Sequence, residues 1–582
     1  MPQGRRRTPF SGKAKKEQLK AKKHNKTTSQ TERFKKPLLV HTSDEEDLTD
    51  LTQKVNYQAY KSGKVHSNRF ALYFHRETDA EIRERKEIAR QTLHPVTEKN
   101  LEINIDDYFA KELDFPQRPA WSYNETLANL EAKENKYFTE YLNNIEKQFD
   151  RKELSYFELN LETWRQLWRV LEMSDIVLVI VDIRFPALMF PPLLYEYVTQ
   201  RLKKDMILVL NKVDLAPAEI VAAWKVYFKE KYPELHVLMF TTLPGYNLIG
   251  KQSDKAGLQV RRRRGKLRMA AEGAQLLLNT CKDIVGNAVD LSSWEEKIKE
   301  ELMLEYAEDN NVEIEKVIDV KNDTGYFEHE KYKNGILTIG CIGQPNVGKS
   351  SLLNAIMGKK VVSVSRTPGH TKHFQTIFLT NNVRLCDCPG LVFPSKVPKT
   401  LQILMGSFPI AQLREPHTTV KYLAERLDLP KLLRIDHPDG DDQWSAMDVC
   451  DGWAKKRGFL TAKAARLDTF RAANNLLRMA LDGKICLCLR PPEYASKKDF
   501  WKSHPDTETV RWIQARSTDE AVGDTNEYGD DEDFSEDDTK PTTSGDPGAS
   551  VSIEGSDDGD DSDSSVERLT VAANKFAVLN DD

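Results

Sequence analysis

The sequence predicts an α/β protein with a mostly parallel sheet, covered by helices, and a phosphate-binding loop. The first observation is a complete G-x-x-x-x-G-K-S motif at residues 343–350. It follows an apolar run at 336–342 and precedes an apolar segment that is typical of a helix. The second observation is a set of short runs rich in Val, Ile and Leu, separated by segments that are predicted to be helical. Strands of a parallel sheet have this composition because both of their faces are buried. These runs occupy residues 176–181, 206–210 and 236–240.

The phosphate loop, residues 343–350, has the chemistry that a nucleotide phosphate requires. Its glycines let successive backbone N–H groups point at an anion, and the positive end of the next helix adds to the attraction. We expect Lys349 to reach the β- and γ-phosphates and Ser350 to ligate Mg²⁺. The alternative is a glycine-rich turn without a ligand, which the agreement of both flanks disfavours. The expected phosphate-binding residues are Gly343, Asn346, Val347, Gly348, Lys349, Ser350 and Ser351.

An Asn-Lys-Val-Asp motif follows the second apolar run and indicates guanine as the base. Asn211 is expected to bond the N7 and O6 side of the purine, and Lys212 to lie over the ring. The carboxylate of Asp214 would accept from N1–H and the 2-amino group, which adenine does not present. The third run leads into Thr-Thr, where the backbone N–H of Thr242 is the expected donor to the base oxygen.

Two segments after the phosphate loop carry candidate metal ligands. Thr371 follows a Pro-Gly turn and is placed to cap Mg²⁺ and to sense the γ-phosphate. A strand at 383–386 leads into Asp-Cys-Pro-Gly, where Asp387 would hold Mg²⁺, through water, and the N–H of Gly390 would bond the γ-phosphate. The expected metal ligands are therefore Ser350, Thr371 and Asp387.

The ends of the 582-residue chain differ sharply in charge. Residues 1–36 are basic and poor in large apolar side chains, so we expect disorder. They fit a nuclear or nucleolar address, an arm for RNA phosphates, or a solvated tail without a partner. Residues 517–582 are rich in Asp, Glu and Ser, which indicates a second disordered tail with phosphorylation sites. A protein partner is expected for this acidic tail.

The seven cysteines show no C-x-x-C pair and are odd in number, so neither a zinc site nor a disulfide framework is expected. No apolar run is long enough to cross a bilayer, and no secretory signal is indicated. We expect an intracellular protein with reduced thiols and no membrane partner.

The order of the motifs is unusual, because the base motif precedes the phosphate loop. The same sheet with its chain termini moved, a circular permutation, explains this order. The sequence resembles the circularly permuted GTPases that include ribosome-assembly factors, over roughly residues 66–516. The resemblance rests on the blocks at 160–175, Asn-Lys-Val-Asp-Leu-Ala-Pro from 211, and Ser-Val-Ser-Arg-Thr-Pro-Gly-His-Thr-Lys-His-Phe-Gln-Thr at 363–376.

The resemblance implies a P-loop GTPase domain at 155–394, with a polar insert at about 245–331. An N-terminal extension at 66–154 would precede it, and a helical C-terminal domain at 395–500 would follow. The helices expected in that last domain are at 401–413, 419–427, 444–457 and 462–482.

The resemblance also implies hydrolysis of GTP to GDP and phosphate, with Mg²⁺. Relatives with Asn at the position of Asn346 often use it to hold K⁺ in place of an arginine finger. Leu391 stands where many switches keep a water-orienting Gln, so slow intrinsic hydrolysis is expected. Gln344 departs from the more usual apolar or aromatic residue. The expected catalytic residues are Lys349, Thr371, Gly390 and Asn346.

The function implied by the resemblance is a GTP-dependent switch in ribosome assembly, in the nucleus or nucleolus with a cytoplasmic pool. RNA or pre-ribosomal particles would bind the basic segments, which include four arginines at 261–264. The alternative is a nucleotide-stabilised nuclear scaffold or signalling regulator that binds GTP with little hydrolysis.

Overall fold

The chain comprises two units, Met1–Gln53 and Lys54–Asp582. The short strand β1 (Thr52–Val55) spans their boundary, and every other described element belongs to the second unit. Both expected tails, 1–36 and 517–582, lie outside the described residues. The structure, a computed structural model, describes residues 52–55, 72–122, 124–242, 271–306, 330–358, 361–362, 364, 375–461 and 465–515.

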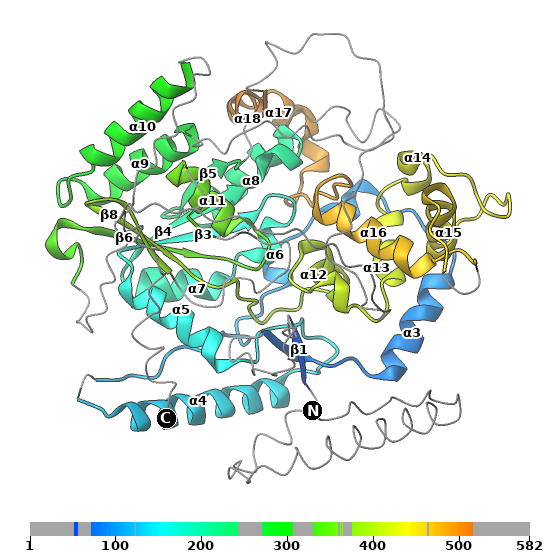
Figure 1. Cartoon of the computed structure of the whole chain (residues 1–582), viewed down its shortest axis with the longest axis horizontal. Coiled ribbons are helices and arrows are strands. Elements are labelled where there is room, and N and C mark those ends of the chain that lie inside the picture. The colour runs from blue at the N-terminus through cyan, green and yellow to red at the C-terminus, as the bar shows by residue number, and fades with distance from the viewer. Residues whose placement is uncertain are drawn as a thin grey trace, which may run out of the picture. The chain divides into compact units, whose positions relative to one another are not determined.

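A six-stranded sheet forms the centre of the second unit, with the order β5-β4-β3-β6-β8-β7 (Figure 1). Five strands are parallel, and β7 alone runs antiparallel to its neighbour β8. Every residue of β3 and β6 is buried, which accounts for their Val- and Ile-rich sequences. The predicted parallel sheet is therefore confirmed. Its strands are β3 (Ile176–Asp182), β4 (Asp205–Asn211), β5 (His236–Phe240), β6 (Leu337–Ile342), β7 (Gln375–Thr380) and β8 (Val383–Asp387).

Helices cover the sheet, and Figure 1 shows α5 and α7 on the opposite side from α9 and α10. Phe190, just before α7, packs on Phe228 of α8 with ring centroids 5.4 Å apart. The α5 helix begins at the N-cap Asn160, whose side chain accepts from the backbone of Glu162. These helices are α5 (Leu161–Met173), α6 (Pro186–Met189), α7 (Pro192–Glu196), α8 (Ala218–Lys231), α9 (Ala271–Val285), α10 (Ser292–Tyr306) and α11 (Lys349–Met357).

A helical region follows the sheet and packs on the segments that precede it. Leu93 donates its backbone N–H to Trp444 O at 2.8 Å, and Val96 donates to Glu425 O at 2.8 Å. The N-terminal segment is thus built into the same core. The remaining elements are β2 (Leu72–His75), α3 (Asp79–Arg90), α4 (Leu127–Gln148), α12 (Lys399–Met405), α13 (His417–Ala424), α14 (Leu429–Leu433), α15 (Ala446–Arg457), α16 (Thr469–Leu481), α17 (Lys498–Lys502) and α18 (Pro505–Ala515).

The expected helix at 401–413 is wrong in its extent. The helix α12 ends at Gly406, which takes φ = 78°, and a 3-10 turn, η6 (Ile410–Gln412), follows after Pro409. Glycine adopts this left-handed conformation without steric cost, and it ends the helix there. Among the described helices, none has the length and apolar composition needed to cross a bilayer. All seven cysteines carry free thiols.

Candidate nucleotide-binding site

The phosphate loop connects β6 to α11 at the carboxyl edge of the sheet. Gly348 has φ = 97°, and a Cβ there would lie 2.5 Å from Asn211 Nδ2. Only glycine fits both the backbone angle and this close approach. Asn346 also has a positive φ, 60°, which Asn tolerates better than most residues. The loop therefore depends on residues that tolerate a left-handed backbone at positions 346 and 348.

Lys349 is the first residue of α11, and its buried side chain reaches back to the start of the loop. Its Nζ donates to Gly343 O at 2.9 Å and to Gln344 O at 2.8 Å. Burial lowers the pKa of Lys349, and the nearby Asp387 opposes that shift. An ammonium has three donors, so one remains for an anion beside the loop.

Asp387 and Ser350 meet where the metal ligands were expected. Ser350 Oγ donates to Asp387 Oδ2 at 3.2 Å. The other carboxylate oxygen, Oδ1, is buried without a hydrogen-bond partner among the described residues, and burial raises the pKa of Asp387 to about 6. Hydroxyl and carboxylate oxygens are the ligands that Mg²⁺ prefers, so these two residues fit the ion. Thr371, the third expected ligand, lies outside the described residues.

Asn211 and Lys212, at the end of β4, both contact the phosphate loop. Asn211 Nδ2 donates to Val347 O at 2.8 Å, and Lys212 Nζ donates to Asn346 O at 2.7 Å. Asn211 Oδ1 is buried without a partner in the described part of the chain. The sequence predicts that both side chains contact the base, and the structure shows that they also join the base motif to the phosphate loop.

Asp214 lies in the short turn η4 (Val213–Leu215) and is buried. Its Oδ1 accepts from Thr241 Oγ1 at 2.9 Å. The first threonine of the Thr-Thr pair thus orients the carboxylate, while Thr242 is half-buried next to it. The two segments expected at the base, after β4 and after β5, therefore lie together.

Two buried charged residues in this region were missed by the sequence analysis. Asp182, the last residue of β3, accepts from Lys212 Nζ at 2.8 Å and from Arg184 Nη2 at 2.8 Å. Burial alone would raise the pKa of Asp182, but the Arg184 and Lys212 charges hold it well below its usual value. The sequence does carry a signal for these two residues. It is the Asp-x-Arg pattern at the end of a buried strand, at the edge of the sheet where ligands bind.

The phosphate loop also contacts the segment that follows α12. Asn346 Nδ2 donates to Gly406 O at 2.9 Å, and Ser407 Oγ donates to Gln344 Oε1 at 2.7 Å. Gln344 Nε2 in turn lies 3.3 Å from Leu188 O. The unusual Gln344 is therefore a buried bridge between the loop and the helical region.

The Asp-Cys-Pro-Gly segment passes beside the phosphate loop. Leu391 donates its backbone N–H to Gly343 O at 3.3 Å, and its side chain is buried. Gly390 lies so close to the loop that an added Cβ would be 2.9 Å from Pro345 Cα. Of the remaining expected residues, Val347 lies in the phosphate loop and is buried, and Ser351 lies in the first turn of α11 and is half-buried.

The fold and these contacts define a class of protein. A phosphate loop after β6, an aspartate at the end of β8, and a base motif after β4 share one edge of a parallel sheet. Because β4 precedes β6 along the chain, this is a P-loop GTPase fold in circularly permuted order. A model of the 50S ribosome-binding GTPase family matches residues 338–426.

Relatives identify the family more narrowly. The chain is 46% identical to guanine nucleotide-binding protein-like 1 of Macaca fascicularis over 544 residues, which are 88% of this chain and 90% of that protein. It is 34% identical to large subunit GTPase 1 of Schizosaccharomyces pombe over 67% of this chain and 61% of that one. The chain belongs to the guanine nucleotide-binding protein-like 1 family and is a GTP-binding protein.

Among solved structures, the chain resembles GNP-bound YlqF from T. maritima. The two are 18% identical, with a TM-score of 0.32, over 57% of this chain and 98% of that one.

Proposed function

We propose that this chain is a slow GTP-hydrolysing switch that acts in the assembly of a ribonucleoprotein particle of the ribosomal type. The observation that carries the proposal is Asp387 Oδ1, which has no hydrogen-bond partner among the described residues and is buried beside Ser350, within the electrostatic range of Lys349. A buried carboxylate oxygen without a partner is costly unless a ligand uses it.

In this proposal Ser350 and Asp387 hold Mg²⁺, with Thr371 as a third ligand. When bound, the ion neutralises charge on the β- and γ-phosphate oxygens. Lys349 and the backbone N–H groups of the phosphate loop bind the same phosphates, and the N–H of Gly390 binds the γ-phosphate. Positioning and charge are the main contributions that a protein makes to phosphoryl transfer.

The base is held by the other half of the site. Asp214 accepts hydrogen bonds from guanine N1–H and the 2-amino group, Lys212 covers the ring, and the N–H of Thr242 donates to the base oxygen. The bond from Thr241 to Asp214 supports this role, because it fixes the carboxylate before the base arrives.

Slow hydrolysis is supported by Leu391, since an apolar buried side chain cannot orient the attacking water. Asn346 supports stimulation by K⁺. Its amide nitrogen is occupied by Gly406 O, which leaves the amide oxygen as a cation ligand. A cation there would stabilise charge that develops in the transition state.

Two of the similarities support a ribosomal particle. One relative is a large subunit GTPase, and the matching family is one of 50S ribosome-binding GTPases. The basic segments at 1–36 and 261–264 suit RNA phosphates. We place the protein in the nucleus or nucleolus, with a cytoplasmic pool, and assign protein partners and phosphoserines to the acidic tail.

A second candidate is a scaffold that binds GTP with little hydrolysis. Leu391 favours it, because a switch that never turns over needs no water-orienting group. Single-turnover hydrolysis in KCl and in NaCl separates the two. The switch predicts that K⁺ stimulates turnover by about 10-fold or more, and that Asn346→Ala removes the stimulation.

The control for this experiment is the affinity of each variant for a fluorescent GTP analogue, which must be comparable for the rates to be compared. Turnover that is absent in both salts, with GTP bound, would overturn the switch and leave the scaffold.

A further inference from the structure

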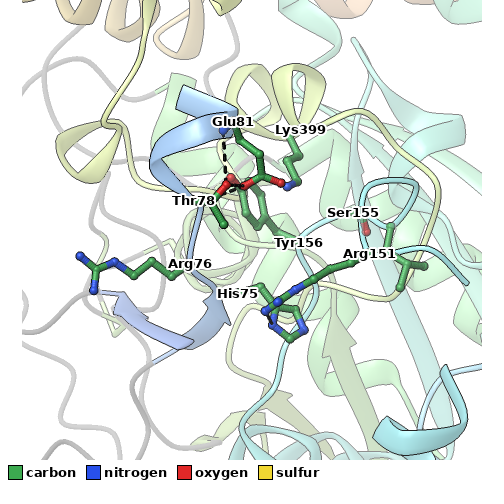
Figure 2. A pocket seen from close by; sticks show the side chains of 9 residues that line it. His75, Arg76, Thr78, Glu81, Arg151, Ser155, Tyr156 and Lys399 are labelled. Atoms are coloured by element: carbon green, nitrogen blue, oxygen red, sulfur yellow. Dashed lines mark hydrogen bonds between the residues drawn. The ribbon is translucent and has the colours of Figure 1, made fainter. Parts of the chain in front are cut away.

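A hollow of about 70 Å³ lies away from the nucleotide site, where β2, α3 and α12 meet the loop before α5 (Figure 2). We call it the basic hollow, because three of its lining residues are cationic. Figure 2 shows Lys399 beside Tyr156, Arg151 next to His75, and Arg76 extending outward. Its lining includes His75, Arg76, Glu81, Arg151, Tyr156 and Lys399.

Lys399 is the most informative of these residues. It is half-buried, and burial lowers its pKa. Its ammonium lies 5.0 Å from the ring centroid of Tyr156, but among the described residues no carboxylate forms an ion pair with it. The nearby Lys396, by contrast, is paired with Glu153. A partly desolvated ammonium without an anionic partner is unfavourable, so the hollow favours an anion.

The nearest acidic groups are already used. Glu81 Oε2 accepts from the backbone N–H of Thr78 at 2.8 Å, which is one bond of the capping box of α3, and also from the Thr78 hydroxyl at 3.0 Å. Glu77 accepts from the Tyr156 hydroxyl at 2.6 Å and is paired with Arg85. The Glu81 and Glu77 charges raise the pKa of Lys399, but among the described residues neither carboxylate lies within ion-pair distance of its ammonium.

The other side of the hollow is also positive. Arg151 donates to His75 Nδ1. Burial, together with Arg151 and Lys399, lowers the pKa of His75 to about 4, so this ring is a neutral hydrogen-bonding group at neutral pH. The positive charge in the hollow therefore comes from Arg151 and Lys399, with Arg76 at the rim, and it exceeds the one carboxylate of the lining, that of Glu81.

The size of the hollow suits one tetrahedral oxyanion. A single water needs about 10–15 Å³ of such space, and the hollow has about 70 Å³. Arg76 and Arg151 are exposed, so they can reach further anionic groups outside it. Repeated anionic groups beside a partly buried phosphate are the chemistry of a nucleic-acid backbone.

The helix α12 connects the basic hollow to the phosphate loop. Its first residue is Lys399, and its C-cap carbonyl, Gly406 O, accepts from Asn346. Between them, Gln402 exchanges two hydrogen bonds with the backbone of Tyr156, at 2.7 and 2.8 Å. The seven residues of α12 span about 10 Å, so a small shift at one end reaches the other.

We propose that the basic hollow binds a backbone phosphate of RNA, and that α12 transmits its occupancy to the nucleotide site. This inference rests on the proposed function, since it names the RNA contact that would report the assembly state to the GTPase.

The test uses the full-length protein with a short oligouridylate. Hydrogen–deuterium exchange reports binding at this place, even where other basic segments also bind RNA. We expect protection of residues 151–156 and 399–405 in the wild type, loss of that protection in Lys399→Met, and retention in the matched control Lys396→Met. The slope of log affinity against log salt should fall by about 1 in Lys399→Met.

The release rate of a fluorescent GDP analogue tests the coupling. Oligouridylate should change this rate in the wild type and in Lys396→Met but not in Lys399→Met. RNA that changes the release rate of Lys399→Met as it does that of the wild type overturns the coupling.

Other outcomes are distinguishable. RNA that binds without protecting these residues overturns the site and leaves the proposed function intact, whereas a wild type that binds GTP but no RNA contradicts the ribonucleoprotein role itself. Equal protection by sodium sulfate at matched ionic strength would reduce the hollow to a site for a free oxyanion. Protection by a phosphoserine peptide alone would replace RNA with a protein partner.

Discussion

At the scale of single residues, the orientation of the Lys212 side chain depends on two buried charged residues, Asp182 and Arg184. The Asp182 side chain is 1% exposed and joins Lys212 to Arg184, whose Nη1 donates to Ala480 O at 2.6 Å. Buried ion pairs of this kind contribute little net stability but fix geometry when all their donors are satisfied. We therefore regard Asp182 as a positioning residue for the base motif.

Replacing Asp182 with Asn should lower the free energy of unfolding by about 3–5 kcal/mol, because the buried Arg184 and the half-buried Lys212 lose their counter-charge. Adding Arg184→Met should recover part of this loss. If Asp182 positions Lys212, the double variant will still bind a fluorescent GDP analogue more weakly than the wild type. Wild-type affinity in the double variant would show that the role is structural only.

Glu158 makes stability depend on pH. Its side chain is fully buried, and Oε1 accepts from the backbones of Tyr73 and Asn160 at 3.1 and 2.8 Å. Burial raises its pKa from 4.5 to about 8. The folded state therefore holds a proton that the unfolded state releases, and the resulting stability is present below about 4.5 and lost as pH rises to about 8.

Glu158→Gln should have a melting temperature that changes less than that of the wild type across this pH range, because the new amide mimics the protonated acid. Glu158→Ala is the control, and it should melt lower at every pH because it leaves two buried donors unsatisfied. Parallel curves of melting temperature against pH for Glu158→Gln and the wild type would contradict the assignment.

At the scale of elements, α12 is the link between the phosphate loop and the helical region. Gly406 caps it with φ = 78°, and a Cβ there would lie 2.9 Å from Asn346 Nδ2. Gly458 caps α15 with φ = 65°, and no atom of the described residues lies within 4 Å of an added Cβ there. The two glycines share a conformation and differ in what they touch.

Gly406→Ala and Gly458→Ala should each cost about 1–2 kcal/mol of stability through the left-handed backbone. Gly406→Ala alone should also weaken binding of a fluorescent GDP analogue, by about 3–10-fold, because it disturbs one hydrogen bond of the phosphate loop. Equal nucleotide affinity in the two variants would show that α12 does not influence the site.

The elements also show how far the sequence predicts this molecule. The Val- and Ile-rich runs predict β3, β4 and β5 to within about one residue, because buried parallel strands have no polar alternation to obscure them. The phosphate loop is equally predictable from the sequence, because the conformation of its own backbone requires glycine. The end of the helix α12 at Gly406 is not predictable in this way, because apolar residues continue in the sequence beyond it.

Contacts between distant segments are the part that the sequence does not reveal. Gln344 is an unexplained departure in the sequence, and it acquires a role only when folding brings Ser407, 63 positions away, to 2.7 Å. The roles of Asp182 and Arg184 likewise depend on Lys212 and on Ala480. Local chemistry predicts the nucleotide, and tertiary packing determines what the site is connected to.

At the scale of the whole second unit, the C-terminal helices complete the base side of the site. Gln514 Nε2, in α18, donates to Val213 O at 2.7 Å and to Ala216 O at 2.8 Å, around the turn that carries Asp214. Trp224 Nε1 donates to Leu489 O at 3.0 Å. The end of the described chain is thus packed on elements that precede the phosphate loop.

Gln514→Ala should weaken guanine-nucleotide binding by about 3–10-fold, because two backbone carbonyls around Asp214 lose a donor. The matched control on the same helix is Arg511→Ala, which removes only a surface ion pair with Glu219 and should change affinity little. Titration of a fluorescent GDP analogue measures both, and equal affinities would contradict a role of α18 in the site.

The most direct test of the central claim is sedimentation of tagged protein from cell extract on a density gradient. Wild type, Lys349→Ala and RNase-treated controls are compared. A nucleotide-dependent switch on a ribosomal-type particle predicts that the wild type travels with large ribonucleoproteins, and that Lys349→Ala and RNase each shift it. If both proteins remain at the top of the gradient, the claim is contradicted and a GTP-binding regulator with another partner takes its place.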